Sequence, residues 1–182
     1  MFRVADNEYD IQSASLELFS RTREDLVVWG VRIIAKHSCD GSGDVAKWNP
    51  SIIADELLQT TPGEKAFWHD IAGTTIEWEE ANPDPQALFE VFETAGIYNC
   101  KCQFLAGPSG TGVQFLLEGT VDVDTDYPRL PIRVETPLSV GPMPWGKMSE
   151  QQCRSEFQRL GFKDPTEYRV INGVSSLIFL DQ

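Results

Sequence analysis

Residues 26–36 read LVVWGVRIIAK, an almost unbroken run of apolar and mostly β-branched side chains. Such residues favour a well-buried extended strand. In the preceding residues 11–19, Ala14, Leu16 and Leu18 fall on one face and polar side chains on the other. Because the polar stretch 21–25 separates the two segments, the sequence predicts an antiparallel hairpin.

Two more hairpins are predicted further along the chain. Residues 97–105 and 113–123 have strand patterns and flank the loop GPSGTG, and residues 168–171 and 175–180 flank Asn172-Gly173, a favoured tight turn. A strand is also expected over 74–79. Residues 126–145 hold five prolines, so we expect there only a short edge strand at 131–135.

Four segments carry helical signals. The helix that begins at Ser149 has the strongest ones, because Gln152 completes a capping box, Cys153, Phe157 and Leu160 form a stripe, and Gly161 follows. The other three are residues 50–57, residues 61–73 (with a strand at 67–71 as the alternative), and residues 85–95. Together these patterns predict an α+β fold, a mainly antiparallel sheet with a few short helices packed on it, in a single globular domain of residues 1–182.

The negative charge is concentrated in the middle of the chain. The net charge is −13, and no Lys or Arg occurs between Lys65 and Lys101. A second acidic stretch runs from Glu118 to Asp126. Such charge repels nucleic acid and anionic lipid and attracts basic partners, although it also serves solubility alone. The first stretch contains the acids Asp70, Glu77, Glu79, Glu80, Asp84, Glu90 and Glu93.

Residues that could carry chemistry do not form a recognised motif. Glu77 and Glu79 would share one face of a strand, a spacing compatible with a glycosidase pair but also with a solvated strand face. Asp122, Asp124 and Asp126 resemble the start of a calcium loop, yet Tyr127 and Arg133 occupy the glycine and glutamate positions. His37 and Cys39 are close sequence neighbours, which rarely form a catalytic pair. We therefore expect no catalytic residue, no metal and no cofactor.

The N-terminus lacks the apolar core of a signal peptide, and no run of 18 apolar residues is present. These features predict a cytoplasmic protein that does not enter a membrane. The thiols Cys39, Cys100, Cys102 and Cys153 are then expected to be buried and reduced. Trp145, in GPMPWG, either packs back onto the domain or anchors a partner.

Charge and the missing motifs together favour a non-catalytic acidic protein-binding module with a basic protein partner. An inhibitor or immunity-type protein that masks a basic toxin or nuclease is the biological form we expect. Two alternatives stay open: a hydrolase or carbohydrate-binding domain that uses the acidic pair with a tryptophan, and a structural accessory subunit. The expected partner-binding residues are Asp70, Glu77, Glu79, Glu80, Asp84, Glu90, Glu93 and Trp145.

Overall fold

The structure of the protein, a computed structural model, describes residues 1–21, 24–37, 49–79, 87–90, 94–108, 110, 112–122 and 128–180. Most of these residues form strands that pair antiparallel, as the sequence predicts. Among the described residues the larger sheet has nine strands: β1 (Phe2–Val4), β2 (Asn7–Arg21), β3 (Leu26–His37), β4 (Ser51–Thr60), β5 (Thr75–Trp78), β6 (Leu88–Glu90), β7 (Thr94–Ala106), β8 (Val113–Val121) and β9 (Leu130–Val140).

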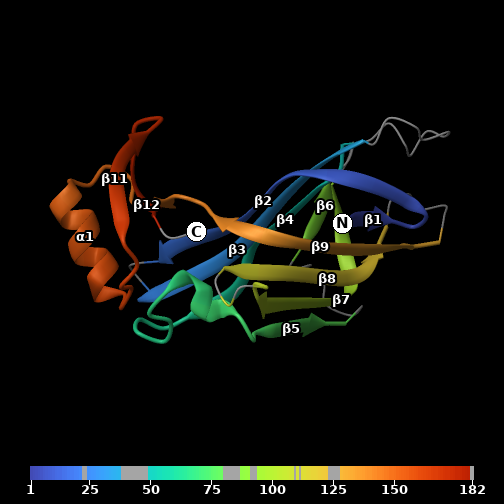
Figure 1. Cartoon of the computed structure of the whole chain (residues 1–182), viewed down its shortest axis with the longest axis horizontal. Coiled ribbons are helices and arrows are strands. Elements are labelled where there is room, and N and C mark those ends of the chain that lie inside the picture. The colour runs from blue at the N-terminus through green and yellow to red at the C-terminus, as the bar shows by residue number, and fades with distance from the viewer. Residues whose placement is uncertain are drawn as a thin grey trace.

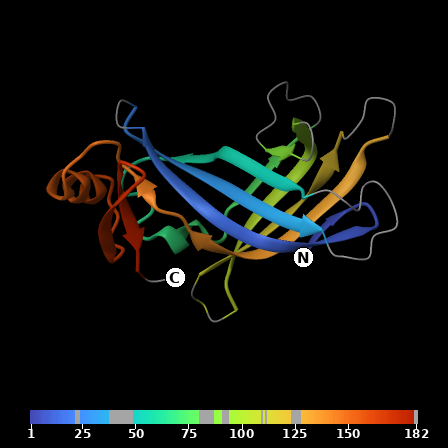
Figure 2. The same cartoon turned by 90° about the horizontal axis from the view of Figure 1, so that it is seen from above.

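This larger sheet closes on itself. Its strands follow the order β5-β7-β6-β4-β3-β2-β1-β9-β8, and in addition β8 pairs with β7 and β9 pairs with β2. The β2–β9 contact is parallel, with Ser15 opposite Ser139. Because β8, the last strand of the order, pairs with β7 near its start, most open sheet edges are removed. Figures 1 and 2 show the long strands curving around a common interior.

Apolar side chains from alternate positions of the strands fill this interior. The rings of Phe104 on β7 and Phe115 on β8 lie 5.2 Å apart. The buried indole of Trp29 donates a 2.7 Å hydrogen bond to Oγ1 of Thr60, so its polar atom is satisfied. The interior of the closed sheet is thus a packed core.

A small sheet and the helix α1 (Glu150–Arg159) cover one end of the closed sheet, at the left of Figure 1. Phe157 of α1 stacks on Phe162 with ring centroids 5.1 Å apart, and Phe162 in turn lies 6.0 Å from Trp29 of β3. These aromatic contacts join α1 to the larger sheet, and residues of both sheets belong to one hydrophobic core. The strands of the small sheet are β10 (Met143–Pro144), β11 (Thr166–Ile171) and β12 (Val174–Phe179).

The segment after α1 also docks on the turn that follows β4. The Gly63 N–H donates to the carbonyl of Leu160 at 2.8 Å. Further on, the buried carboxylate of Asp164 accepts hydrogen bonds of 3.2 and 3.3 Å from the Trp68 N–H, at the start of the 3₁₀ helix η2 (Trp68–Ile71). Burial raises the pKa of Asp164 to about 6, against the opposing effect of the hydrogen bond from Trp68.

The structure corrects the prediction of a few short helices. Within the described residues α1 is the one α-helix. Of the residues predicted to be helical at 50–57, all but the first belong to β4, and those at 61–73 form turns and the short η2. The segment predicted as a helix at 85–95 contributes β6 and the start of β7, while residues 85–86 and 91–93 lie outside the described residues.

A bulge explains why β4 resembles a helix in sequence. Opposite Gly30, the register moves from Val31↔Ala54 to Trp29↔Leu58, so the buried positions of β4 change phase after Ala54. A Cβ atom at Gly30 would lie 2.8 Å from the Ala54 carbonyl oxygen, which shows how closely the two backbones approach. The broken alternation leaves apolar residues at helical spacing although each half is extended.

Local predictions at turns and caps are confirmed. β2 pairs with β3, β7 with β8, and β11 with β12 around Asn172-Gly173. The Ser149 N–H donates to Gln152 Oε1 at 2.9 Å in the capping box of α1.

The predicted edge strand at 131–135 is instead the long β9, which lies between β8 and the strands β1 and β2. No helix in the described part of the chain is long and apolar enough to cross a membrane.

Candidate functional site

The acids of the base-free stretch have different surroundings in the structure. Asp70 lies in η2, Glu77 lies on β5, Glu79 directly follows β5, and Glu90 ends β6. Glu80, Asp84 and Glu93, which were also predicted to bind the partner, lie outside the described residues. The structure therefore allows four of the seven acids to be assessed as surface groups.

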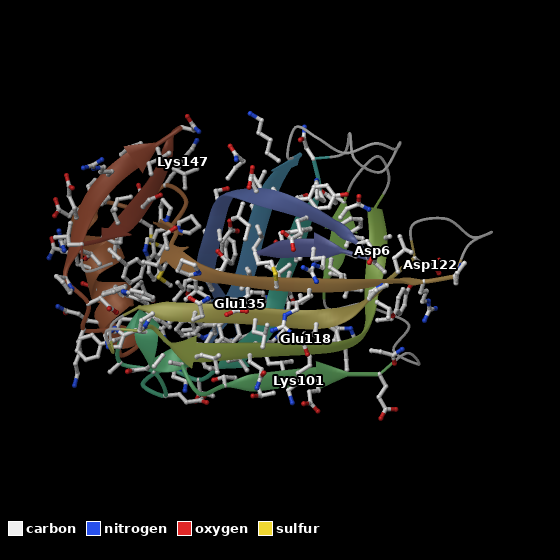
Figure 3. The ribbon with its side chains drawn as sticks, turned by 45° about the vertical axis from the view of Figure 1, so that its right-hand side comes forward. Asp6, Lys101, Glu118, Asp122, Glu135 and Lys147 are labelled. Atoms are coloured by element: carbon white, nitrogen blue, oxygen red, sulfur yellow. The ribbon has the colours of Figure 1, made fainter. Side chains whose placement is uncertain are left out.

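Glu77 is neutralised by a base from the neighbouring strand. Its Oε1 lies 2.7 Å from Nζ of Lys101, which is its register partner on β7. On its other side, Lys101 is opposite Glu118 of β8. Glu118 is in turn opposite Arg133 of β9, and Nη1 of Arg133 lies 2.5 Å from Oε1 of Glu118. Figure 3 shows Lys101 and Glu118 on adjacent strands of this outer face.

The same row of charges continues onto β1 and β2. Arg133 is opposite Arg3 of β1, and Arg3 pairs with Glu8 of β2. Arg133 also lies 3.6 Å from Glu135. Acids and bases are thus interleaved across six strands, so this outer face carries little net charge. The sequence gap between Lys65 and Lys101 does not correspond to a base-free region of the surface.

Asp70 and Glu90 have contacts within the molecule. The Asp70 carboxylate accepts hydrogen bonds from the backbone N–H groups of Ala66 at 3.0 Å and Phe67 at 2.9 Å, which holds the start of η2. The Oε2 of Glu90 accepts a 3.3 Å hydrogen bond from Ser51 Oγ on β4. Asp70 therefore has a structural role that its sequence position does not indicate.

Four further acids lie at the end of the closed sheet opposite α1. Figure 3 shows Asp6 and Asp122 at this end, Glu90 ends β6 there, and Figure 1 shows that β5 runs towards it and leads into Glu79. We call these four acids the acidic end. Asp6 and Glu79 are exposed and form no ion pair with any other described residue, whereas Asp122 lies 3.5 Å from Arg129.

The charge is also uneven along the sequence. Residues 38–48, 91–93 and 123–127, which lie outside the described residues, contain five Asp or Glu residues and one Lys. By contrast, residues 129–182 carry seven bases and six acids. The excess of acids therefore belongs to the part of the sequence before residue 129.

Trp145 is not on the surface. It is 6% exposed and packs with the hydrophobic core, and its backbone N–H donates to the carbonyl of Ser175 at 2.8 Å. Of its two predicted placements, the structure shows packing onto the domain. We leave Trp145 out of the candidate surface for this reason.

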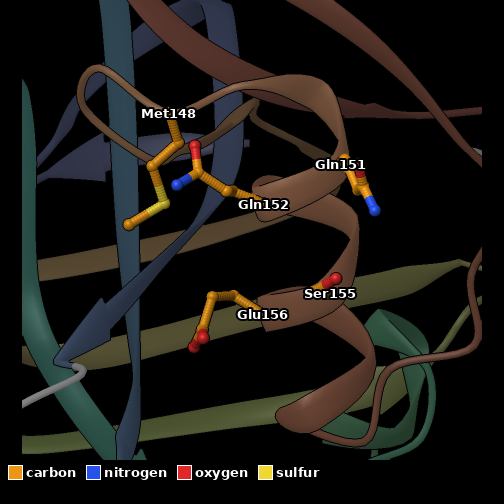
Figure 4. A pocket seen from close by; sticks show the side chains of 5 residues that line it. All are labelled: Met148, Gln151, Gln152, Ser155 and Glu156. Carbon is orange, nitrogen blue, oxygen red and sulfur yellow. The ribbon is translucent and has the colours of Figure 1, made fainter.

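A hollow lies beside α1 (Figure 4). Met148, Gln151, Gln152, Ser155 and Glu156 line it. Glu156 is paired with Arg159 at 2.7 Å, and Gln152 belongs to the capping box. Within the described residues, no three His, Cys, Asp or Glu side chains are grouped in a way that would hold a metal ion.

The carboxylate pair of the hydrolase alternative lies on open surface. Glu77 and Glu79 are both exposed, and Glu77 already has Lys101 as a partner. Trp78, between them, is buried and donates from Nε1 to the carbonyl of Ile97 at 2.8 Å. A sugar ring could not stack on this tryptophan while it stays packed inside.

Comparison of the chain with protein-family models, with curated proteins and with solved structures gave no match. The candidate surface therefore rests on the geometry and charge of this chain.

Proposed function

We propose that this chain is a non-catalytic protein-binding module that uses its acidic end to bind a basic partner protein. One observation carries the proposal: Glu77 and Glu118 on the outer strand face are paired with bases, whereas Asp6 and Glu79 are exposed and form no ion pair with described residues. Unpaired exposed charges on one side of a molecule produce a field that steers an oppositely charged partner.

The biological form that this chemistry suits best is an inhibitor or immunity-type protein that masks a basic toxin or nuclease. Its target would have a basic substrate-binding surface, because enzymes that act on nucleic acid must attract phosphates. A rigid, filled, closed sheet provides a stable base from which such a protein could present charge. Glu80, Asp84 and Glu93 stay in the proposal as predicted contacts, although they lie outside the described residues.

The test compares two charge-reversed variants as bait for basic proteins. The first carries Asp6→Lys and Glu79→Lys at the acidic end, and the second carries Glu150→Lys and Glu167→Lys near α1. Both variants change the net charge by the same amount. Captured proteins are identified for wild type and both variants, and association rates are then measured with the purified partner at low and high salt.

We expect the acidic-end variant to associate on the order of tenfold more slowly than wild type at low salt, and the difference to shrink at high salt. The α1 variant should retain a rate near that of wild type. Equal slowing of both variants would show that only net charge matters, and it would remove the acidic end from the interface.

A further inference from the structure

Two cysteines face each other inside the closed sheet. Cys100 and Cys102 lie on the inward face of β7, and their sulfur atoms are 3.9 Å apart. Both are buried, at 2% and 0% exposed. Cys153, the other described thiol, lies on a separate element, α1. Cys100 and Cys102 thus form a dithiol that the proposed binding function does not use.

The backbone geometry is compatible with a disulfide. Two steps along a strand span roughly 6.6 Å, which is within the Cα separation of about 4.4–6.8 Å found in disulfides. The sulfur atoms would have to approach from 3.9 Å to about 2.05 Å. A separation near the upper limit produces a strained and readily reduced bond.

A β-bulge next to Cys100 frees this residue from regular pairing with β8. The β7–β8 register shifts between Tyr98 and Lys101, and Asn99 has a positive φ of 46°. Gly119 of β8 allows the two backbones to approach closely here, since a Cβ there would lie 3.0 Å from the Tyr98 carbonyl oxygen and 3.4 Å from the Cα of Cys100. Because of the shift, Cys100 has no register partner on β8 that a small backbone movement would displace.

The dithiol is shielded by a short strand. On the β5 side, Trp78 is the register partner of Cys100 and Ile76 is that of Cys102. β5 has four residues and pairs with β7 only, within the described part of the chain. Short edge strands open more readily than the centre of a sheet. Opening of β5 is the simplest route by which a small oxidant reaches these thiols.

We propose that Cys100 and Cys102 form a reversible disulfide within β7, and that opening of β5 controls its formation. The oxidant is a small disulfide such as oxidised glutathione. Cys100 loses its proton and its thiolate attacks the oxidant, which releases one glutathione thiolate and leaves a mixed disulfide. Cys102 then loses its proton, and its thiolate attacks the Cys100 sulfur and releases the second glutathione thiolate. The two released glutathione thiolates take up the two protons. Two protein thiols are oxidised and one glutathione disulfide is reduced to two thiols.

This order of attack follows from the surroundings of the two thiols. The hydrogen bond with Cys100 and burial raise the pKa of the Cys102 thiol well above its usual value. Cys102 is therefore held in its protonated, unreactive form while Cys100 remains a thiol beside it. Reaction of Cys100 removes that hydrogen bond and leaves Cys102 in position to resolve the mixed disulfide.

The test uses the full chain with Cys39→Ala, because Cys39 lies outside the described residues and could compete for the oxidant. Folded protein is incubated with oxidised glutathione, remaining thiols are blocked, and the protein is digested with trypsin. Trypsin cleaves after Lys101, between the two cysteines, so the disulfide appears as two linked peptides that dithiothreitol separates. The intact protein should lose the mass of two hydrogen atoms.

Cys100→Ala and Cys102→Ala should each abolish the linked peptides, and the thiol left behind should carry at most one glutathione. Cys153→Ala should leave the product unchanged. Alanine is chosen because a buried serine hydroxyl would need a new hydrogen-bond partner. If a variant does not fold, the identity of the linked peptides in the Cys39→Ala protein still decides the result. Linked peptides in urea but not in the folded protein would overturn the proposal.

A second variant tests the control by β5. Ile76→Ala weakens the packing of this strand and should speed oxidation several-fold, whereas Val170→Ala, at an exposed position of β11, should not. Equal rates in both variants would show that β5 does not control access.

Discussion

Nζ of Lys101 lies 2.7 Å from Oε1 of Glu77 across the β5–β7 pair, so the base that ends the acidic stretch neutralises an acid from within it. Both side chains are about half exposed. Because Glu77 pairs with Lys101 and Glu118 with Arg133, these acids add little net charge to the outer strand face. The proposed binding surface is therefore the acidic end, where Asp6 and Glu79 have no ion pair with described residues.

The Glu77–Lys101 pair should contribute little to stability. We predict a coupling of about 0.2–1 kcal/mol between Glu77→Ala and Lys101→Ala, because exposed pairs lose most of their attraction to solvent screening. Urea denaturation of wild type, both single variants and the double variant measures this value. The coupling should decrease at high salt. A salt-independent coupling well above this range would mean that the pair is shielded from solvent.

Phe157 should be one of the residues on which α1 depends most. It is 4% exposed, stacks on Phe162 and meets Phe179 edge-on at 5.8 Å. We predict that Phe157→Ala costs roughly 3–5 kcal/mol, from lost burial and the cavity left behind. Glu156→Ala, the matched control, removes a partly exposed side chain that pairs with Arg159, and should cost under about 1 kcal/mol. Chemical denaturation of both variants would show whether α1 is part of the core, and equal small losses would contradict it.

Asp164 should make stability depend on pH. Its pKa in the folded protein is raised to about 6 from an ordinary value of 3.8, so the folded state holds this proton more tightly than the unfolded state. The charged carboxylate therefore lowers stability above about pH 6, and stability is regained as the pH falls towards 4. The gain is at most about 3 kcal/mol, reduced by any solvent that reaches the group.

The test of this pH effect is a comparison with Asp164→Asn. The amide oxygen of asparagine can still accept from the Trp68 N–H, but it does not titrate. The free energy of unfolding is measured as the pH is lowered from about 7.5 to about 4.5. The change over this range should be more favourable to the folded state in wild type than in the variant. Identical pH profiles would show that Asp164 titrates at its ordinary pKa.

The contact between Gly161 and Gly63 should tolerate no added side chain. Gly161 has a φ of +89°, and a Cβ there would lie 2.5 Å from the Cα of Gly63. Gly173, in the β11–β12 turn, has a similar φ of +79° but nothing within 4 Å of such a Cβ. Gly173→Ala should therefore cost about 1–2 kcal/mol for its left-handed backbone, and Gly161→Ala at least twice as much because of the added clash. Thermal unfolding of both variants separates the two effects, and equal costs would contradict the close packing at this junction.

Turns and caps were predictable because their signals lie within a few residues of each other. Asn172-Gly173 selects a tight turn through the positive φ that both residues adopt, and Ser149 with Gln152 caps α1 through side chains three positions apart. The same local reasoning failed at β4. There the bulge opposite Gly30 shifts the alternation, and a helix and a bulged strand leave similar apolar spacings.

The sequence by itself determined the antiparallel hairpins, the capped helix and an overall excess of negative charge, since each depends on neighbouring residues or on composition. Only the tertiary structure decided which acids stay unpaired, because Glu77 meets Lys101 and Glu118 meets Arg133 across strands whose register is set by closure of the sheet. The burial of Trp145 was decided in the same way. Charge pairing and burial depend on contacts between distant segments, and no local pattern specifies those contacts.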